Sequence, residues 1–333
     1  MIDEIEHSFV EIGDLRIHLA EQGEGPLVLL LHGFPECWYS WRHQFQPLAA
    51  AGYRVVAPDQ RGYARSDQPA EIEEYSLLHL AGDVIGLIHA LGTEQAVVVG
   101  HDWGAIVAWT VAMLRPDVVR AVAGLSVPPH LPGGCVPLAT SRKRFGDKYY
   151  QVYFQQPGIA DAELVQDPSA SFRYILTGAS GESEPRTWIV PAEGLIDPAA
   201  HAIPLPGWLS EDDIGVYVRE FDRHGDRAFT GALNWYRNID RNWKLLSAFH
   251  GRRIEVPALY VGGTRDSALS ARGADQVLSD LEQDAPQLYS TVLLQDCGHW
   301  TQQERPDDVT TVLLRFLAHV GDSTAEHPAN PLR

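Results

Sequence analysis

The residues most able to do chemistry lie in one short segment between a predicted strand and a predicted helix. The apolar run at 97–99 is followed by the sequence GHDWG, with Asp102 at its centre, and a helical pattern begins at once. Small residues on both sides of Asp102 permit a nucleophile elbow, a strained turn that lifts the central side chain above a sheet. The helix N-terminus stabilises negative charge there. A carboxylate in this place can attack carbon and form an alkyl ester.

A plainer interpretation of this segment is a turn bracketed by glycines, in which Asp102 only caps the helix. A nucleophile needs an orienting acid and a base later in the chain, in the order nucleophile, acid, His. Asp266 and His299 follow the last two predicted strands, where parallel sheets place their sites. This order favours Asp102 as nucleophile, His299 as general base and Asp266 as the acid that orients it. Asp296 is a second candidate for that acid.

Another predicted strand ends in the sequence HGFP, residues 32–35. A loop in this position supplies one amide of an oxyanion hole, and the residue after the nucleophile supplies the other. We therefore expect the backbone amides of Phe34 and Trp103 to hold the charge that develops when water attacks an ester carbonyl. The alternative is a Gly-Pro loop with no catalytic part.

These residues need a fold that brings several strand ends together. Strand-like runs are predicted at 8–12, 15–22, 27–31, 54–57, 96–99, 121–125, 258–261 and 291–294, and helices at 77–91, 104–114 and 306–318. Short unbroken apolar runs are typical of strands buried on both faces of a parallel sheet, and Gly13-Asp14 is expected to turn a hairpin. The alternation predicts an α/β fold. Its core is expected at 1–129 and 246–320, with a helical lid at 130–245 and a disordered tail at 321–333.

The composition excludes several classes of protein. The chain has 333 residues, a net charge of −18 and three lysines, which argues against a nucleic-acid partner and an anionic membrane surface. No apolar stretch is long enough to span a bilayer. The acidic start, MIDEIEHSF, lacks the apolar segment of a secretory signal, and three widely spaced cysteines make neither a disulfide framework nor a metal site. We expect a reducing cytoplasm and no metal.

Four motifs together resemble the single-domain epoxide hydrolases of the α/β-hydrolase fold. They are HGFP at 32–35, DQRGYARS at 59–66, GHDWGA at 100–105 and DCGHW at 296–300. The resemblance covers about residues 8–317 and implies a mostly parallel eight-stranded sheet with an inserted helical lid. Ala64 stands where the family often has Gly, a departure in a structural loop.

Two segments of the lid extend the resemblance. YYQVYFQQPG at 149–158 is similar to a motif whose tyrosine before the first Gln points into the site, and LNWYRN at 233–238 is similar to the segment with the second lid tyrosine. The resemblance implies that Tyr150 and Tyr236 donate hydrogen bonds to the epoxide oxygen. A phenol suits this task because its pKa of about 10 keeps it protonated at neutral pH. Tyr149 and Tyr153 are expected to pack. By analogy, the pocket is lined by Phe34, Trp103, Phe154 and Trp300.

The resemblance implies that an epoxide and water form a vicinal diol through an ester on Asp102, without a metal or an organic cofactor. Two alternatives stay open. A haloalkane dehalogenase uses the same Asp, acid and His but needs halide-binding donors, and Phe34 stands where many dehalogenases carry a polar or Trp halide ligand. Fluoroacetate dehalogenases usually have Arg where this chain has Trp103. The second alternative is a ligand-binding member of the fold that lost turnover. A homodimer through the lid follows from analogy alone.

Overall fold

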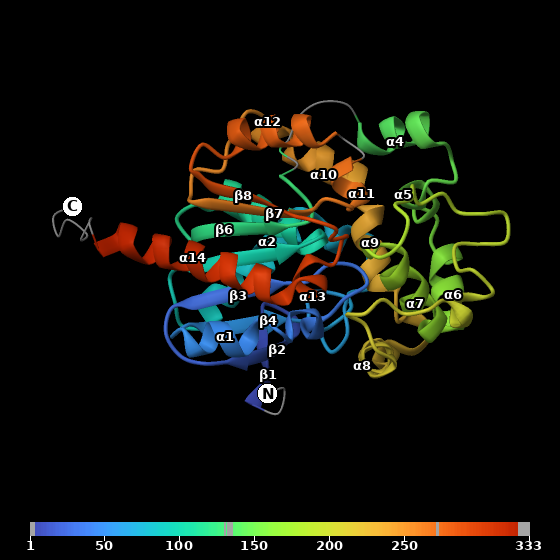
Figure 1. Ribbon diagram of the computed structural model, residues 1–333, viewed down its shortest axis with the longest axis horizontal. Coiled ribbons are helices and arrows are strands. Elements are labelled where there is room, and N and C mark those ends of the chain that lie inside the picture. The colour runs from blue at the N-terminus through green and yellow to red at the C-terminus, as the bar shows by residue number, and fades with distance from the viewer. Residues whose placement is uncertain (1–3, 130, 132–135, 271–272, 326–333) are drawn as a thin grey trace.

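The structure is a computed structural model that describes residues 4–129, 131, 136–270 and 273–325 (Figure 1). Its sheet has eight strands in the order β1-β2-β4-β3-β5-β6-β7-β8. The strands are β1 (Glu6–Ile12), β2 (Leu15–Gln22), β3 (Leu27–Leu31), β4 (Arg54–Pro58), β5 (Ala96–His101), β6 (Val119–Leu125), β7 (Ala258–Gly263) and β8 (Leu288–Leu294). β2 pairs antiparallel with β1 and with β4, and the other neighbouring strands are parallel. The predicted mostly parallel eight-stranded sheet is confirmed.

The central strands are the ones that the apolar runs predicted best. Every residue of β3 and of β5 is buried, because helices cover both faces of the sheet there. The hairpin at Gly13-Asp14 is also confirmed, with Ile12 opposite Leu15 and a positive φ of 58° at Gly13. The parallel strands β3, β5, β6, β7 and β8 all end toward the same edge of the sheet, which positions the loops that follow them.

Helices cover the sheet and fill the long connection between β6 and β7. They are α1 (Phe45–Ala50), α2 (Leu77–Ala90), α3 (Trp103–Leu114), α4 (Pro137–Phe145), α5 (Tyr150–Tyr153), α6 (Ile159–Gln166), α7 (Pro168–Gly178), α8 (Glu211–Phe221), α9 (Thr230–Arg237), α10 (Ile239–Leu246), α11 (Ser267–Ser270), α12 (Ala274–Asp284), α13 (Thr301–Glu304) and α14 (Pro306–Ala325). α2 buries the face that its sequence spacing predicted, including Leu80, Val84 and Leu87. No described helix is long and apolar enough to cross a membrane.

The helices α4 to α10 form the insertion, and α5 to α9 gather on one side of the sheet in Figure 1. They contact the core through partly buried ion pairs, of which one joins Arg65 to Glu220 of α8 at 2.6 Å. α10 ends at Leu246, one position beyond the lid boundary that we expected. Residues 130 and 132–135 lie outside the described part. The division into a core at 1–129 and 246–320 and a lid at 130–245 stays a prediction.

Two predicted element ends were wrong by three residues or more. α14 continues to Ala325, seven residues beyond its predicted end at residue 318, and the tail expected at 321–333 stays a prediction. The buried side chain of Val320 carries the apolar face of the helix past the predicted end at residue 318, and Gly321 alone does not stop it. Residues 326–333 lie outside the described part. β8 begins at Leu288, three residues before its predicted start. The first three residues of this edge strand, which include the exposed Tyr289, form no apolar run that could have marked its beginning.

Candidate active site

Asp102 stands between β5 and α3 in a backbone conformation with φ 53° and ψ −119°. Glycines make this turn possible. A Cβ on Gly100 would lie 2.1 Å from the carbonyl oxygen of Gly104, and a Cβ on Gly104 would lie 2.1 Å from that of Leu31. The Asp102 side chain makes no capping hydrogen bond to the helix. The geometry therefore favours the elbow over the interpretation in which Asp102 only caps α3.

Asp102, His299 and Asp266 form a continuous chain of contacts. His299 Nε2 lies 3.3 Å from Asp102 Oδ2, and His299 Nδ1 lies 2.9 Å from Asp266 Oδ2. The other oxygen of Asp266 accepts the amide of Ala268 at 2.8 Å, and only 1% of the Asp266 side chain is exposed. Asp296, the second candidate for the orienting acid, is exposed. The strand ends bring Asp266, and not Asp296, to the imidazole.

Charges within this chain set the pKa values of its members. Burial alone would raise the pKa of Asp102, but the hydrogen bond and charge of His299 outweigh burial and hold that pKa below its usual value. Burial would lower the pKa of His299, while the charge of Asp266 and the hydrogen bond to Asp102 raise it well above its usual value. The resting pair is therefore an Asp102 carboxylate beside a protonated His299.

A backbone amide meets the Asp102 carboxylate from the loop after β3. The amide of Phe34 donates to Asp102 Oδ1 at 2.8 Å. Close approach of the two segments depends on Gly33, because a Cβ there would lie 2.3 Å from the Cβ of Asp102. Trp103 occupies the first position of α3, next to Asp102. The part of its amide in an oxyanion hole stays a prediction.

The two predicted lid tyrosines lie together over the elbow. Tyr150 begins α5 and Tyr236 belongs to α9, and their ring centroids are 5.9 Å apart. Tyr236 packs edge-on against Trp103 at 5.1 Å and against Phe34 at 5.4 Å. Burial raises the pKa of both phenols well above its usual value, and the nearby Asp102 charge raises it further. Both side chains therefore keep their proton and can donate it.

The neighbouring tyrosines differ from each other. Tyr153 points away from the site, because its hydroxyl donates to Glu163 Oε2 at 2.8 Å. Tyr149 lines the cavity and stacks on Phe145 with centroids 4.7 Å apart. Packing describes Tyr149 only in part, because it also shares a side-chain hydrogen bond with Tyr150, whose ring lies 4.8 Å away.

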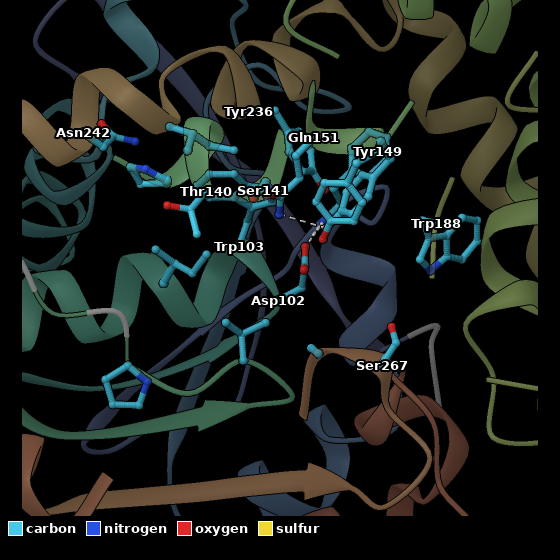
Figure 2. A pocket seen from close by; sticks show the side chains of 18 of the residues that line it. Asp102, Trp103, Thr140, Ser141, Tyr149, Gln151, Trp188, Tyr236, Asn242 and Ser267 are labelled. Atoms are coloured by element: carbon cyan, nitrogen blue, oxygen red, sulfur yellow. Dashed lines mark hydrogen bonds between the residues drawn. The ribbon is translucent and has the colours of Figure 1, made fainter. Parts of the chain in front are cut away.

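One cavity of about 1270 Å³ lies between the nucleophile and the lid tyrosines (Figure 2). Its wall includes Asp102, His299, Tyr150 and Tyr236, and also the four residues expected in the pocket, which are Phe34, Trp103, Phe154 and Trp300. Figure 2 shows Asp102 pointing into this space below the lid side chains Tyr236, Gln151 and Tyr149. Among the described residues, no group of three or more His, Cys, Asp or Glu side chains could hold a metal ion.

The sequence pattern did not identify the buried groups that hold the backbone of His299. The carbonyl of His299 accepts Ser126 Oγ at 2.5 Å and His101 Nε2 at 2.7 Å. His101 Nδ1 in turn lies 2.7 Å from Glu36 Oε2, and both side chains are fully buried. His101 lies beside the nucleophile, and Glu36 directly follows HGFP. The position of each residue beside a motif was the only sequence signal for a functional part. The contact between His101 and Glu36 depends on tertiary structure and could not be predicted.

A second carboxylate fixes the loop of His299 to the lid. Glu304 Oε2 accepts the amides of Gly298 at 3.0 Å and Gly181 at 2.8 Å, and its Oε1 accepts the amide of Trp300 at 3.0 Å. The amide of His299 itself donates to the carbonyl of Ala179 at 2.9 Å. The catalytic loop and the lid segment after α7 are therefore one hydrogen-bonded unit.

Known proteins with the same fold and a comparable length give the family. A family model described as alpha/beta hydrolase fold matches residues 26–306. Epoxide hydrolase A of Mycobacterium tuberculosis (strain ATCC 25618 / H37Rv) is 45% identical over 316 residues, which cover 92% of this chain and 96% of that protein. Epoxide hydrolase 3 of Siraitia grosvenorii is 39% identical, over 95% of this chain and 99% of that protein.

Solved structures agree with the sequence comparison. The crystal structure of epoxide hydrolase VrEH1 from Vigna radiata superposes with a TM-score of 0.89 at 38% identity, over 96% of this chain and 99% of that one. An epoxide hydrolase from an endophytic Streptomyces gives a TM-score of 0.89 at 43% identity, over 96% of this chain and 97% of that one. The chain belongs to the epoxide hydrolases of the α/β-hydrolase fold.

Proposed function

We propose that this protein converts an epoxide and water to a vicinal diol through a covalent ester on Asp102. The observation that carries the proposal is that Asp102, His299 and two phenols line one cavity, with Asp266 behind His299. A nucleophilic carboxylate below the substrate and proton donors above it suit the opening of a strained ring, whose oxygen would otherwise leave as an alkoxide.

In the first half of the reaction, an oxygen of Asp102 attacks one epoxide carbon and the bond from that carbon to the ring oxygen breaks. Tyr150 and Tyr236 hold the departing oxygen, and one phenol supplies its proton. The product of this step is a hydroxyalkyl ester. The lowered pKa of Asp102 favours the reaction because it keeps the nucleophile ionised.

In the second half, His299 takes a proton from water and the hydroxide adds to the ester carbonyl. Esterification has removed the negative charge of Asp102, which is one cause of the raised pKa of His299, so that pKa falls at this stage. The imidazole then releases its resting proton to solvent, regains it when the carboxylate is restored, and is free in between to act as the base. The amides of Phe34 and Trp103 hold the carbonyl oxygen as it becomes negative. Hydrolysis of the ester to a carboxylate releases one proton, which replaces the proton that the phenol gave.

The test is a panel of aryl, alkyl and terminal epoxides together with haloalkanes, offered to the wild type and to Asp102→Ala. We expect diol from epoxides, lost in the variant. Halide release without diol would instead support the dehalogenase alternative and make the tyrosine pair a packing feature. Turnover of neither class would favour a ligand-binding role. The homodimer and the cytoplasmic location stay predictions from the sequence.

A further inference from the structure

Gln151 is a polar side chain of the cavity wall to which the proposed reaction gives no part. It follows Tyr150 in α5, and its Nε2 donates to the phenol oxygen of Tyr150 at 3.1 Å. It lines the same cavity as Asp102. Figure 2 shows Gln151 with Tyr149 and Tyr236 on the side of the cavity above Asp102.

The backbone that carries Gln151 is fixed relative to both phenols. The side-chain Nε2 of Gln155 donates to the backbone carbonyl of Gln151 at 2.7 Å and to that of Tyr236 at 3.0 Å. Arg237 Nε adds a hydrogen bond to the carbonyl of Phe154 at 3.2 Å. These contacts tie α5 to α9, so the Gln151 amide meets Tyr150 in a defined geometry.

The direction of the hydrogen bond has a chemical consequence. An amide N–H can only donate, so the phenol proton of Tyr150 cannot point at Gln151 Nε2. The acceptors left to it are the hydroxyl of Tyr149, with which Tyr150 shares a hydrogen bond, and the oxygen of a bound epoxide. Burial, followed by the neighbouring Tyr149 and Asp102, raises the pKa of Tyr150, and the Gln151 hydrogen bond opposes them. A donor beside the phenol oxygen stabilises the negative charge that collects there when the proton leaves.

We propose that Gln151 is a positioning residue for epoxide opening, which directs the Tyr150 O–H toward the epoxide oxygen and stabilises the phenol oxygen as it gives up its proton. The proposal rests on the proposed function and concerns its first half only. The proton passes from Tyr150 to the departing oxygen while the bond from Asp102 to carbon forms. The Gln151 amide exchanges no atom in this step.

The first test is Gln151→Met, which keeps the length of the side chain and removes the donor. We expect the rate constant for ester formation to fall about tenfold, the size of effect that follows from losing one hydrogen bond to a developing charge. The rate constant for ester hydrolysis should not change. Both are measured in single turnovers by rapid quenching and the intact mass of the protein.

A double-mutant cycle separates this role from general packing. Each single tyrosine variant retains the other phenol. In Tyr150→Phe, Gln151→Met should cause no further loss, whereas in Tyr236→Phe, the matched control, it should cause the full tenfold loss. If Gln151→Met slowed ester formation further in the Tyr150→Phe variant, the proposal would be overturned. Gln151 would then act on the substrate or on the fold and not through Tyr150.

Gln151→Glu gives an independent readout that packing would not produce. The ionised carboxylate only accepts hydrogen bonds, whereas the neutral carboxyl can donate its O–H to the phenol oxygen. The rate of ester formation, expressed relative to the wild type, should therefore rise as the pH falls through the titration of the introduced carboxyl. A flat ratio would contradict the proposal. A wild type without diol formation would sink the proposed function itself, whereas an active wild type matched by Gln151→Met would sink only this inference.

Discussion

At the scale of single residues, the site works through opposing effects on ionisation. Burial disfavours charge on both Asp102 and His299, yet their mutual contact and the Asp266 carboxylate reverse that effect. The result is a carboxylate that stays ionised and an imidazole that carries the proton at rest. In the proposed reaction, ester formation neutralises Asp102 and leaves Asp266 as the charge beside the ring. The same histidine thus has different pKa values in the two halves of the reaction.

Asp266→Asn tests this balance. Removing the negative charge lowers the pKa of His299, so the acid limb of the ester-hydrolysis rate should move to lower pH. The plateau rate should also fall about 10²- to 10⁴-fold, because the amide no longer fixes the tautomer of the imidazole. The measurement is the decay of the ester in single turnovers across a pH series. An acid limb at the wild-type pH would show that Asp266 does not set the ionisation of His299.

At the scale of elements, the sequence predicted the strands that are buried on both faces and the residues at their ends. β5 was expected at 96–99 and runs two residues further, to His101, so that Asp102 follows it directly. Asp102, Asp266 and His299 each follow a predicted parallel strand. Their proximity could be predicted because parallel strands end at one edge of the sheet. The helices of the lid had no predictable bounds, because their aromatic and polar side chains pack on the core and on one another without a clear period.

Glu304 shows what sequence patterns miss at this scale. It follows the catalytic loop and accepts three amides, two from that loop and one from the lid. Glu304→Gln replaces one acceptor oxygen by a donor group, which leaves buried amides without a partner. We expect the free energy of unfolding to fall by about 2 kcal/mol, and ester hydrolysis to slow more than ester formation, because the loop positions His299.

Urea unfolding and single-turnover kinetics measure these two effects. The matched control is Glu282→Gln on the exposed surface of α12, which should change neither. Equal slowing of both half-reactions by Glu304→Gln would mean that the carboxylate supports the whole site and not the histidine loop in particular.

At the scale of the whole molecule, the proposed reaction depends on two parts of the chain that are far apart in sequence. The sheet provides Asp102, Asp266 and His299, and the inserted helices provide both phenols. Partly buried ion pairs, such as Arg65 with Glu220, join the core to the insertion. Family resemblance could assign the tyrosines to the site, but neither spacing nor composition could give their distance from the nucleophile.

A single turnover in water enriched in ¹⁸O tests the central claim most directly. Enzyme in excess over an epoxide should give diol without ¹⁸O, because the new oxygen comes from Asp102. The label should appear in the peptide that contains Asp102, since the water oxygen enters its carboxylate. His299→Gln should accumulate protein heavier by one epoxide. Labelled diol from the first turnover, with an unlabelled peptide, would mean that water attacks the epoxide directly and would contradict the aspartyl ester.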